Sequence, residues 1–125
     1  MLVPNVLRYV NRAQAANCKS DASAILTELQ ADVADVYSLG GTVADDGTVT
    51  VPTGVTYGGT ELTAIGGKTG TGTYNAAPAA NNYTFTIETD STAANYGTVT
   101  EFSYGNANWT VVWDVENGWE EPAGR

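Results

Sequence analysis

The chain has 125 residues, enough for one domain with a single hydrophobic core. Its 14 acidic and 5 basic residues give a formal charge of −9, and a surface this acidic argues against binding to DNA or RNA. The sequence contains no histidine, which removes the commonest general base and most zinc sites. The composition therefore favours a structural or binding protein over an enzyme.

Residues 1–39 have the composition of a helix, and residues 40–125 have that of a β-rich domain. The first segment contains no glycine and is rich in Ala, Leu and Val, and "SLGG" at 38–41 supplies the glycines that commonly end a helix. All 14 glycines and all three tryptophans lie in the second segment. The sequence therefore predicts an α+β fold, with one long N-terminal helix (1–39) packed on the antiparallel β-sheet of a globular head (40–125).

The apolar side chains of the predicted helix change face midway. At ~100° per residue, the first group lies on a different side of the helix from the second. The first group is Leu2, Val3, Val6, Leu7 and Val10, and the second is Ala22, Ile25, Leu29, Val33 and Val36. We expect the second group to pack on the head. The helix should be roughly 57 Å long and the head about 30 Å across, so about twenty residues should extend beyond the head to meet other molecules.

The head contains several strand-like segments. Residues 47–51 and 54–65 are predicted as short strands, 66–82 as a loop, and 82–89, 97–104 and 109–115 as an antiparallel meander. Trp109 and Trp113 are four residues apart, so both should lie on the meander face that the helix covers. The predicted head-packing residues are Cys18, Ile25, Leu29, Val33, Val36, Trp109 and Trp113.

Motifs for catalysis or cofactors are weak. "GGKTG" at 66–70 lacks the first glycine of a phosphate-binding loop, because Leu62 stands there. The stretches 45–47 and 114–118 offer oxygen ligands for Ca²⁺, but acidic turns have this composition without a metal. No spacing singles out carboxylates such as Glu88 and Glu101 as a catalytic pair. We expect no enzymatic activity and no cofactor, with Ca²⁺ as the open alternative.

Charge is segregated along the predicted helix. A basic stripe occupies the first half and an acidic stripe the second; they consist of Arg8, Arg12 and Lys19, and of Asp21, Glu28, Asp32 and Asp35. Two interpretations stay open: the stripes are two solvated faces, or they set the axial stagger between copies of the chain in a filament. On the second interpretation, reversing the charges of Arg8 and Arg12 abolishes assembly and leaves the stability of the head unchanged.

The stretch "LVPNVLRYVNRAQAANCKSDASAILTELQAD" at 2–32 resembles the helix of type IV pilins and type II secretion pseudopilins, just after their apolar membrane segment. In that family an aliphatic-proline step leads into basic residues and then into an amphipathic half packed on an antiparallel sheet. Leu2, Val3 and Pro4 match the step, and the basic stripe matches the basic residues.

The resemblance implies a subunit that polymerises through its helix into an extracellular filament at the cell surface. Its partners would be like subunits and, before assembly, the inner membrane; nucleic acid is not expected. The implied assembly residues are Leu2, Val3, Pro4, Val6, Leu7, Arg8, Val10 and Arg12. The membrane anchor and processing site of the family would lie upstream of Met1, which suggests an N-terminal truncation. A role in motility, adhesion, DNA uptake or secretion stays open.

A second hypothesis is a glycan-binding or adhesive extracellular module. Such a module would stack sugars on a flat sheet face bearing Tyr83, Tyr104, Trp109 and Trp113. Large aromatic side chains on the inner face of a meander more often belong to the core. The exposure of the two tryptophans, and of the first half of the helix, discriminates between the hypotheses.

Overall fold

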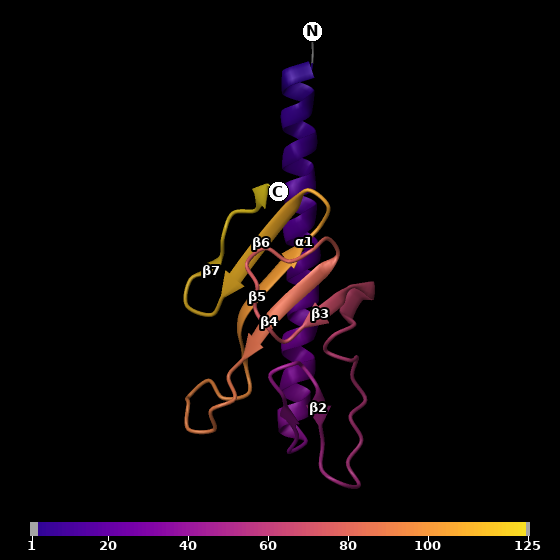
Figure 1. The fold of residues 1–125 in the computed structure, drawn as a ribbon, viewed down its shortest axis with the longest axis vertical. Coiled ribbons are helices and arrows are strands. Elements are labelled where there is room, and N and C mark those ends of the chain that lie inside the picture. The colour runs from indigo at the N-terminus through magenta and orange to yellow at the C-terminus, as the bar shows by residue number, and fades with distance from the viewer. Residues whose placement is uncertain (1–2, 125) are drawn as a thin grey trace.

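The computed structural model of the chain describes the backbone of residues 3–124 and the side chains of residues 13–124. A single long helix, α1 (Val3–Ser38), precedes a set of short strands and one 3-10 helix (Figure 1). These are β1 (Thr42–Val43), β2 (Val49–Thr50), η1 (Ile65–Gly67), β3 (Thr69–Thr71), β4 (Asn82–Ile87), β5 (Val99–Gly105), β6 (Trp109–Asp114), β7 (Gly118–Trp119) and β8 (Ala123–Gly124). The α+β class predicted from the sequence is confirmed.

Helix α1 ends in a glycine cap. The amide of Gly41 donates to the carbonyl oxygen of Val36 at 2.9 Å, and the amide of Gly40 donates to that of Tyr37 at 3.1 Å. This pair of bonds is the Schellman motif, which needs a left-handed residue after the helix. Gly40 supplies it with a φ of +82°. The two glycines of "SLGG" therefore end the helix as the sequence predicts.

The sheet is built around the predicted meander. Strands β4, β5 and β6 are antiparallel neighbours, with Tyr83 opposite Tyr104 and Phe102 opposite Trp113. Strand β3 adds to β4 in parallel at one edge, and β7 and β8 both pair with β6 at the other. Strands β1 and β2 form a separate two-stranded sheet, and β1 packs beside the C-terminal part of α1, where the Val43 N–H donates to the Tyr37 hydroxyl at 3.3 Å.

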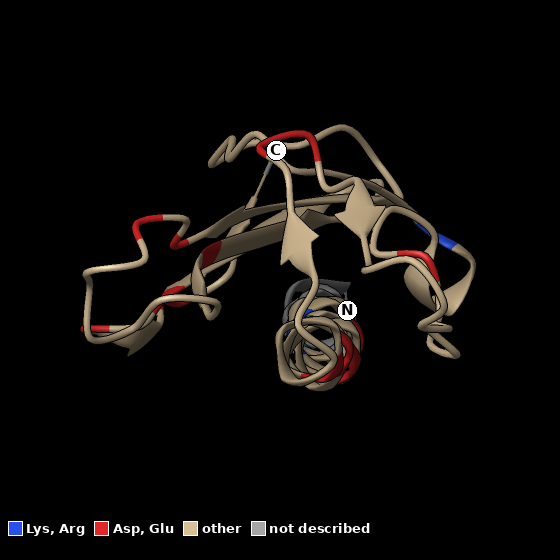
Figure 2. Ribbon diagram, turned by 90° about the horizontal axis from the view of Figure 1, so that it is seen from below, with Lys and Arg blue, Asp and Glu red and all other residues tan. Residues whose placement is uncertain are grey.

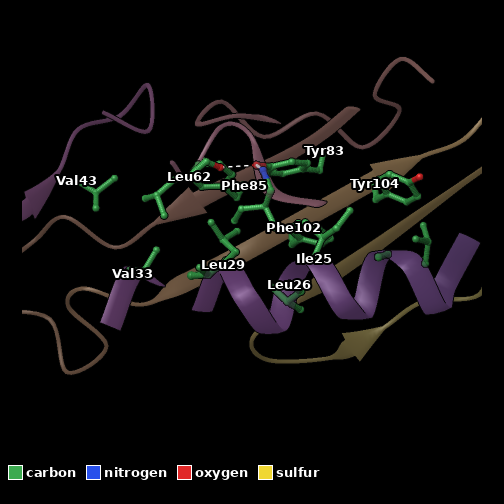
Figure 3. Close-up of a cluster of buried hydrophobic side chains, with 14 of the residues drawn as sticks. Ile25, Leu26, Leu29, Val33, Val43, Leu62, Tyr83, Phe85, Phe102 and Tyr104 are labelled. Atoms are coloured by element: carbon green, nitrogen blue, oxygen red, sulfur yellow. Dashed lines mark hydrogen bonds between the residues drawn. The ribbon is translucent and has the colours of Figure 1, made fainter. Parts of the chain in front are cut away.

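The core lies between α1 and the inner face of the sheet (Figure 3). The second half of α1 contributes Cys18, Ala22, Ile25, Leu26, Leu29, Val33 and Val36, and the sheet contributes Tyr83, Phe85, Val99, Phe102, Tyr104 and Val111. Viewed along α1, the helix lies beneath the concave side of the sheet, which extends on both sides of it (Figure 2). One side of the helix is therefore covered and the opposite side is not.

Part of the sheet face that is turned away from α1 is covered by an irregular segment around Asn75. Two buried hydroxyl groups on this face, those of Thr84 and Ser103, form a short hydrogen bond with each other. The backbone N–H of Asn75 donates to Thr84 Oγ1 at 2.9 Å, and Ser103 Oγ donates to the carbonyl oxygen of Asn75 at 2.6 Å. The hydrogen bonds of these two hydroxyl groups are thus made within the chain itself.

Two segments differ from the sequence predictions. The segment 54–65, predicted as a strand, is irregular up to residue 64 and then enters η1; within it the Tyr57 hydroxyl donates to the Thr60 carbonyl oxygen at 2.7 Å and closes a local turn. Residues 66–82, predicted as a loop, contain β3, where Gly70 pairs with Tyr83. Gly70 is required there because the ring of Tyr83 fills the space that a Cβ atom would occupy.

Candidate functional site

The side of α1 that faces away from the sheet is an exposed surface of small side chains, which we call the outer face. It consists of Ala16, Ser20, Ser23, Ala24, Thr27 and Ala31, and it forms a shallow groove along the helix with Lys19 and Glu28 at its edges. Small side chains let a second helix approach closely. The sequence analysis did not single out this surface, although the spacing of Ala, Ser and Thr by three and four residues is its signal.

The N-terminal part of α1 continues beyond the sheet (Figure 1). Among the described side chains, the first buried one is Cys18, and Ala13, Ala16 and Asn17 before it are exposed. The side chains of the predicted assembly residues lie outside the described ones; these are Leu2, Val3, Pro4, Val6, Leu7, Arg8, Val10 and Arg12. The helical backbone begins at Val3, so most of these positions lie on the projecting helix.

Three carboxylates follow one edge of the outer face, and we call them the acidic flank: Glu28, Asp32 and Asp35 (Figure 2). The hydroxyl of Thr60 donates to Glu28 Oε1 at 3.1 Å. Asp32 is half-buried, and its Oδ2 atom is buried without a hydrogen-bond partner. Leaving a buried acceptor unpaired costs free energy, so Asp32 is held in an unfavourable environment within the single chain.

The acidic flank concentrates negative charge. Burial raises the pKa of Asp32 above its ordinary value of 3.8, the neighbouring Glu28 and Asp35 raise it further, and the backbone N–H of Thr60 opposes them. Burial and the same three carboxylates raise the pKa of Tyr57 to about 12. Only two basic residues occur between 13 and 124: Lys68, which donates to Asn81 Oδ1 at 3.3 Å, and Lys19, which is exposed.

We expect the Asp32→Asn variant to be more stable than the native chain at pH 7. The raised pKa means that the folded chain binds the Asp32 proton more tightly than the unfolded chain does. The contribution of Asp32 to stability is therefore greatest below pH 3.8 and falls as the pH rises through its folded-state pKa. Urea unfolding at pH 7 and pH 3 should show a gain only at pH 7. Asp45→Asn, at an exposed turn, is the matched control, and a loss of stability in Asp32→Asn at pH 7 would contradict the prediction.

The predicted head-packing residues lie between α1 and the sheet, but to different depths. All five on the helix are buried: Cys18, Ile25, Leu29, Val33 and Val36. Trp109 and Trp113 pack against the same cluster yet remain half-buried. Strand β6 is followed only by the two-residue strands β7 and β8, so its tryptophans lie near the sheet edge and are less covered than expected.

The aromatic residues of the glycan hypothesis do not form an open platform. Tyr83 and Tyr104 are fully buried, and the hydroxyl of Tyr83 is bound by the loop at 62–65. Trp113 borders a mostly apolar groove with Ala34 and Val115 at the edge of the helix. The aromatic rings of the sheet therefore contribute mainly to the core.

The acidic turns considered for Ca²⁺ use their carboxylates to hold the backbone. Asp114 Oδ1 accepts the N–H groups of Glu116 at 2.9 Å and Asn117 at 2.7 Å, which holds the pKa of Asp114 below its usual range. Asp46 Oδ1 accepts the N–H of Thr48 at 3.0 Å with the same effect on its pKa. Within the described part of the chain, no three Asp, Glu or Cys residues are grouped so as to hold a metal ion.

The carboxylates weighed as a catalytic pair belong to a shallow acidic groove on the sheet. Glu101 lies directly opposite Asp114 on the neighbouring strand, and Glu88 lines the same groove. No basic side chain and no nucleophile with an activating base lies among the residues that line it. This arrangement suggests a solvated acidic surface.

Comparisons with protein-family models, with curated proteins and with solved structures find no match for this chain. Among the described residues, no helix combines the length and the apolar character needed to cross a lipid bilayer.

Proposed function

We propose that the chain is a pilin or pseudopilin subunit that polymerises through its N-terminal helix into an extracellular filament. The observation that carries this proposal is the one-sided packing of α1. Its buried side chains face the sheet, and its outer face of small side chains is left uncovered (Figure 2). A helix that serves only its own head has no need of a long projecting part or of a continuous small-residue face.

The projecting part of the helix supports the same proposal. Its sequence carries five aliphatic side chains on a different side from those that pack on the head, namely Leu2, Val3, Val6, Leu7 and Val10. Packing of these side chains against neighbouring helices supplies the free energy of assembly. The inner membrane is the proposed location of the subunit before assembly.

The test is to shear surface filaments from the source cells and identify the chain in them. We expect to find peptides of this chain in the filament fraction. Deletion of its gene should remove the filaments, or leave filaments that lack the chain. Finding the chain only as a monomer, in cells that do produce surface filaments, would contradict the proposal.

A further inference from the structure

Among the residues that the structure describes, no basic side chain is paired with the acidic flank. Glu28 and Asp35 are exposed, Asp32 has a buried oxygen without a partner, and the nearby polar contact comes from the neutral Thr60. The exposed Lys19 precedes Glu28 by nine residues, which is about 14 Å along a helix. Within the described chain the acidic flank is thus left without a complementary charge, which a second molecule can supply.

The same helix carries the complementary charge at its other end. All three basic residues of α1 precede all four of its acidic residues in the sequence. At ~100° per residue, the basic positions lie about 180° around the helix axis from the acidic flank. Two copies placed side by side in the same orientation therefore bring the basic side of one toward the acidic side of the other.

Residue spacing gives a register for this contact. Arg8 precedes Glu28 by 20 residues, and Arg12 precedes Asp32 by the same interval. An axial shift of about 30 Å between two copies therefore aligns both pairs at once. Shorter shifts also align opposite charges, such as the shift of nine residues that brings Lys19 level with Glu28.

The size of the head selects among these registers. The head covers α1 from Cys18, the first buried side chain described, to the end of the helix at Ser38, which is also an interval of 20 residues. Because the sheet extends on both sides of the helix (Figure 2), two heads in the same orientation collide when the shift is much shorter than the head. A shift of about 20 residues places the projecting part of one helix beside the acidic flank of the next and displaces the two heads along the axis.

We infer that the acidic flank is the docking surface for the Arg8–Arg12 turn of a second copy of this chain, shifted by about 30 Å along the helix axis. This inference rests on the proposed function and names the contact that sets the register of assembly. The interface joins two different surfaces of the same chain with a shift along the helix axis, so it cannot close into a ring and continues as a linear array. It also places a guanidinium group beside the half-buried Asp32 carboxylate.

The test is a charge exchange in the full chain, expressed in the source cells. Arg8→Glu with Arg12→Glu, and separately Glu28→Arg with Asp32→Arg, should each lower filament yield at least ~10-fold, because both replace attraction with like-charge repulsion. Combining all four substitutions should restore filaments. Lys68→Glu is the matched control: Lys68 lies in the head, outside α1, where it donates to Asn81 Oδ1 at 3.3 Å, so filaments of this variant should persist.

The outcomes separate this inference from the proposed function. Filaments that persist in either double variant, fail to return in the fourfold variant, or disappear with Lys68→Glu would overturn the register. Unfolding curves of each variant identify any loss of filaments that comes from misfolding. If Glu28→Arg with Asp32→Arg misfolds, Glu28→Gln with Asp32→Asn takes its place and should still reduce the filament yield. Absence of the chain from native filaments would instead overturn the proposed function itself.

Discussion

The Phe102→Ala variant should lose about 3–5 kcal/mol of unfolding free energy, because truncating a buried aromatic side chain leaves a cavity in the core. Phe102 is fully buried on the central strand β5. Its ring stacks on that of Tyr83, with centroids 6.0 Å apart, and meets the ring of Trp119 edge-on at 6.2 Å. Urea unfolding followed by tryptophan fluorescence measures the loss.

The exposed Tyr96 provides the control for Phe102. Its side chain is 37% exposed and meets the ring of Tyr37 edge-on. Tyr96→Ala should therefore cost clearly less than Phe102→Ala. Equal unfolding midpoints for Phe102→Ala and the native chain would show that α1 does not pack on this face of the sheet.

The Tyr83→Phe variant should lose about 2–4 kcal/mol, because it leaves a buried donor and a buried acceptor unpaired. The Tyr83 hydroxyl donates to the carbonyl oxygen of Leu62 at 2.5 Å and accepts the N–H of Ile65 at 2.9 Å. These bonds hold the loop at 62–65 over the sheet, where both Leu62 and Ile65 are buried. Tyr96→Phe, at the exposed ring, should change the midpoint little.

Alkaline unfolding gives a second measure of the same contact. Burial raises the pKa of Tyr83 to about 12. The native chain should therefore lose stability as the pH rises from 10 through 12, since only the unfolded chain ionises readily there. The Tyr83→Phe variant should show a shallower loss over this range. If Tyr83→Phe lost stability as steeply as the native chain does, the alkaline unfolding would come from other groups, such as Tyr57.

The sequence predicts those parts of the fold whose signals are local. The end of α1 follows from two glycines, and the meander follows from alternation along three segments that are neighbours in the chain. Strand β3 could not be found this way, because Thr69, Gly70 and Thr71 show no apolar alternation and pair with β4 across a long segment. The requirement for Gly70 becomes visible only when the ring of Tyr83 is placed over it.

The candidate site, like the fold, can be predicted from the sequence only in part. The separation of basic from acidic residues along the helix is readable from the sequence, because helical periodicity fixes which residues share a side. The buried Oδ2 atom of Asp32 is not readable, since it depends on the loop around Thr60 that packs beside α1. The half-burial of Trp113 likewise depends on how few residues β7 and β8 add beyond β6.

The central claim, that the chain assembles through α1 and leaves its head outside, is tested most directly by thiol labelling of filaments. Ser23→Cys lies on the outer face and Thr92→Cys lies on an exposed loop of the head, whereas the native Cys18 is buried and supplies the background. Both introduced thiols should react rapidly in the isolated chain. In assembled filaments, Ser23→Cys should become protected and Thr92→Cys should stay reactive; equal reactivity of Ser23→Cys in the two states would contradict assembly through the helix.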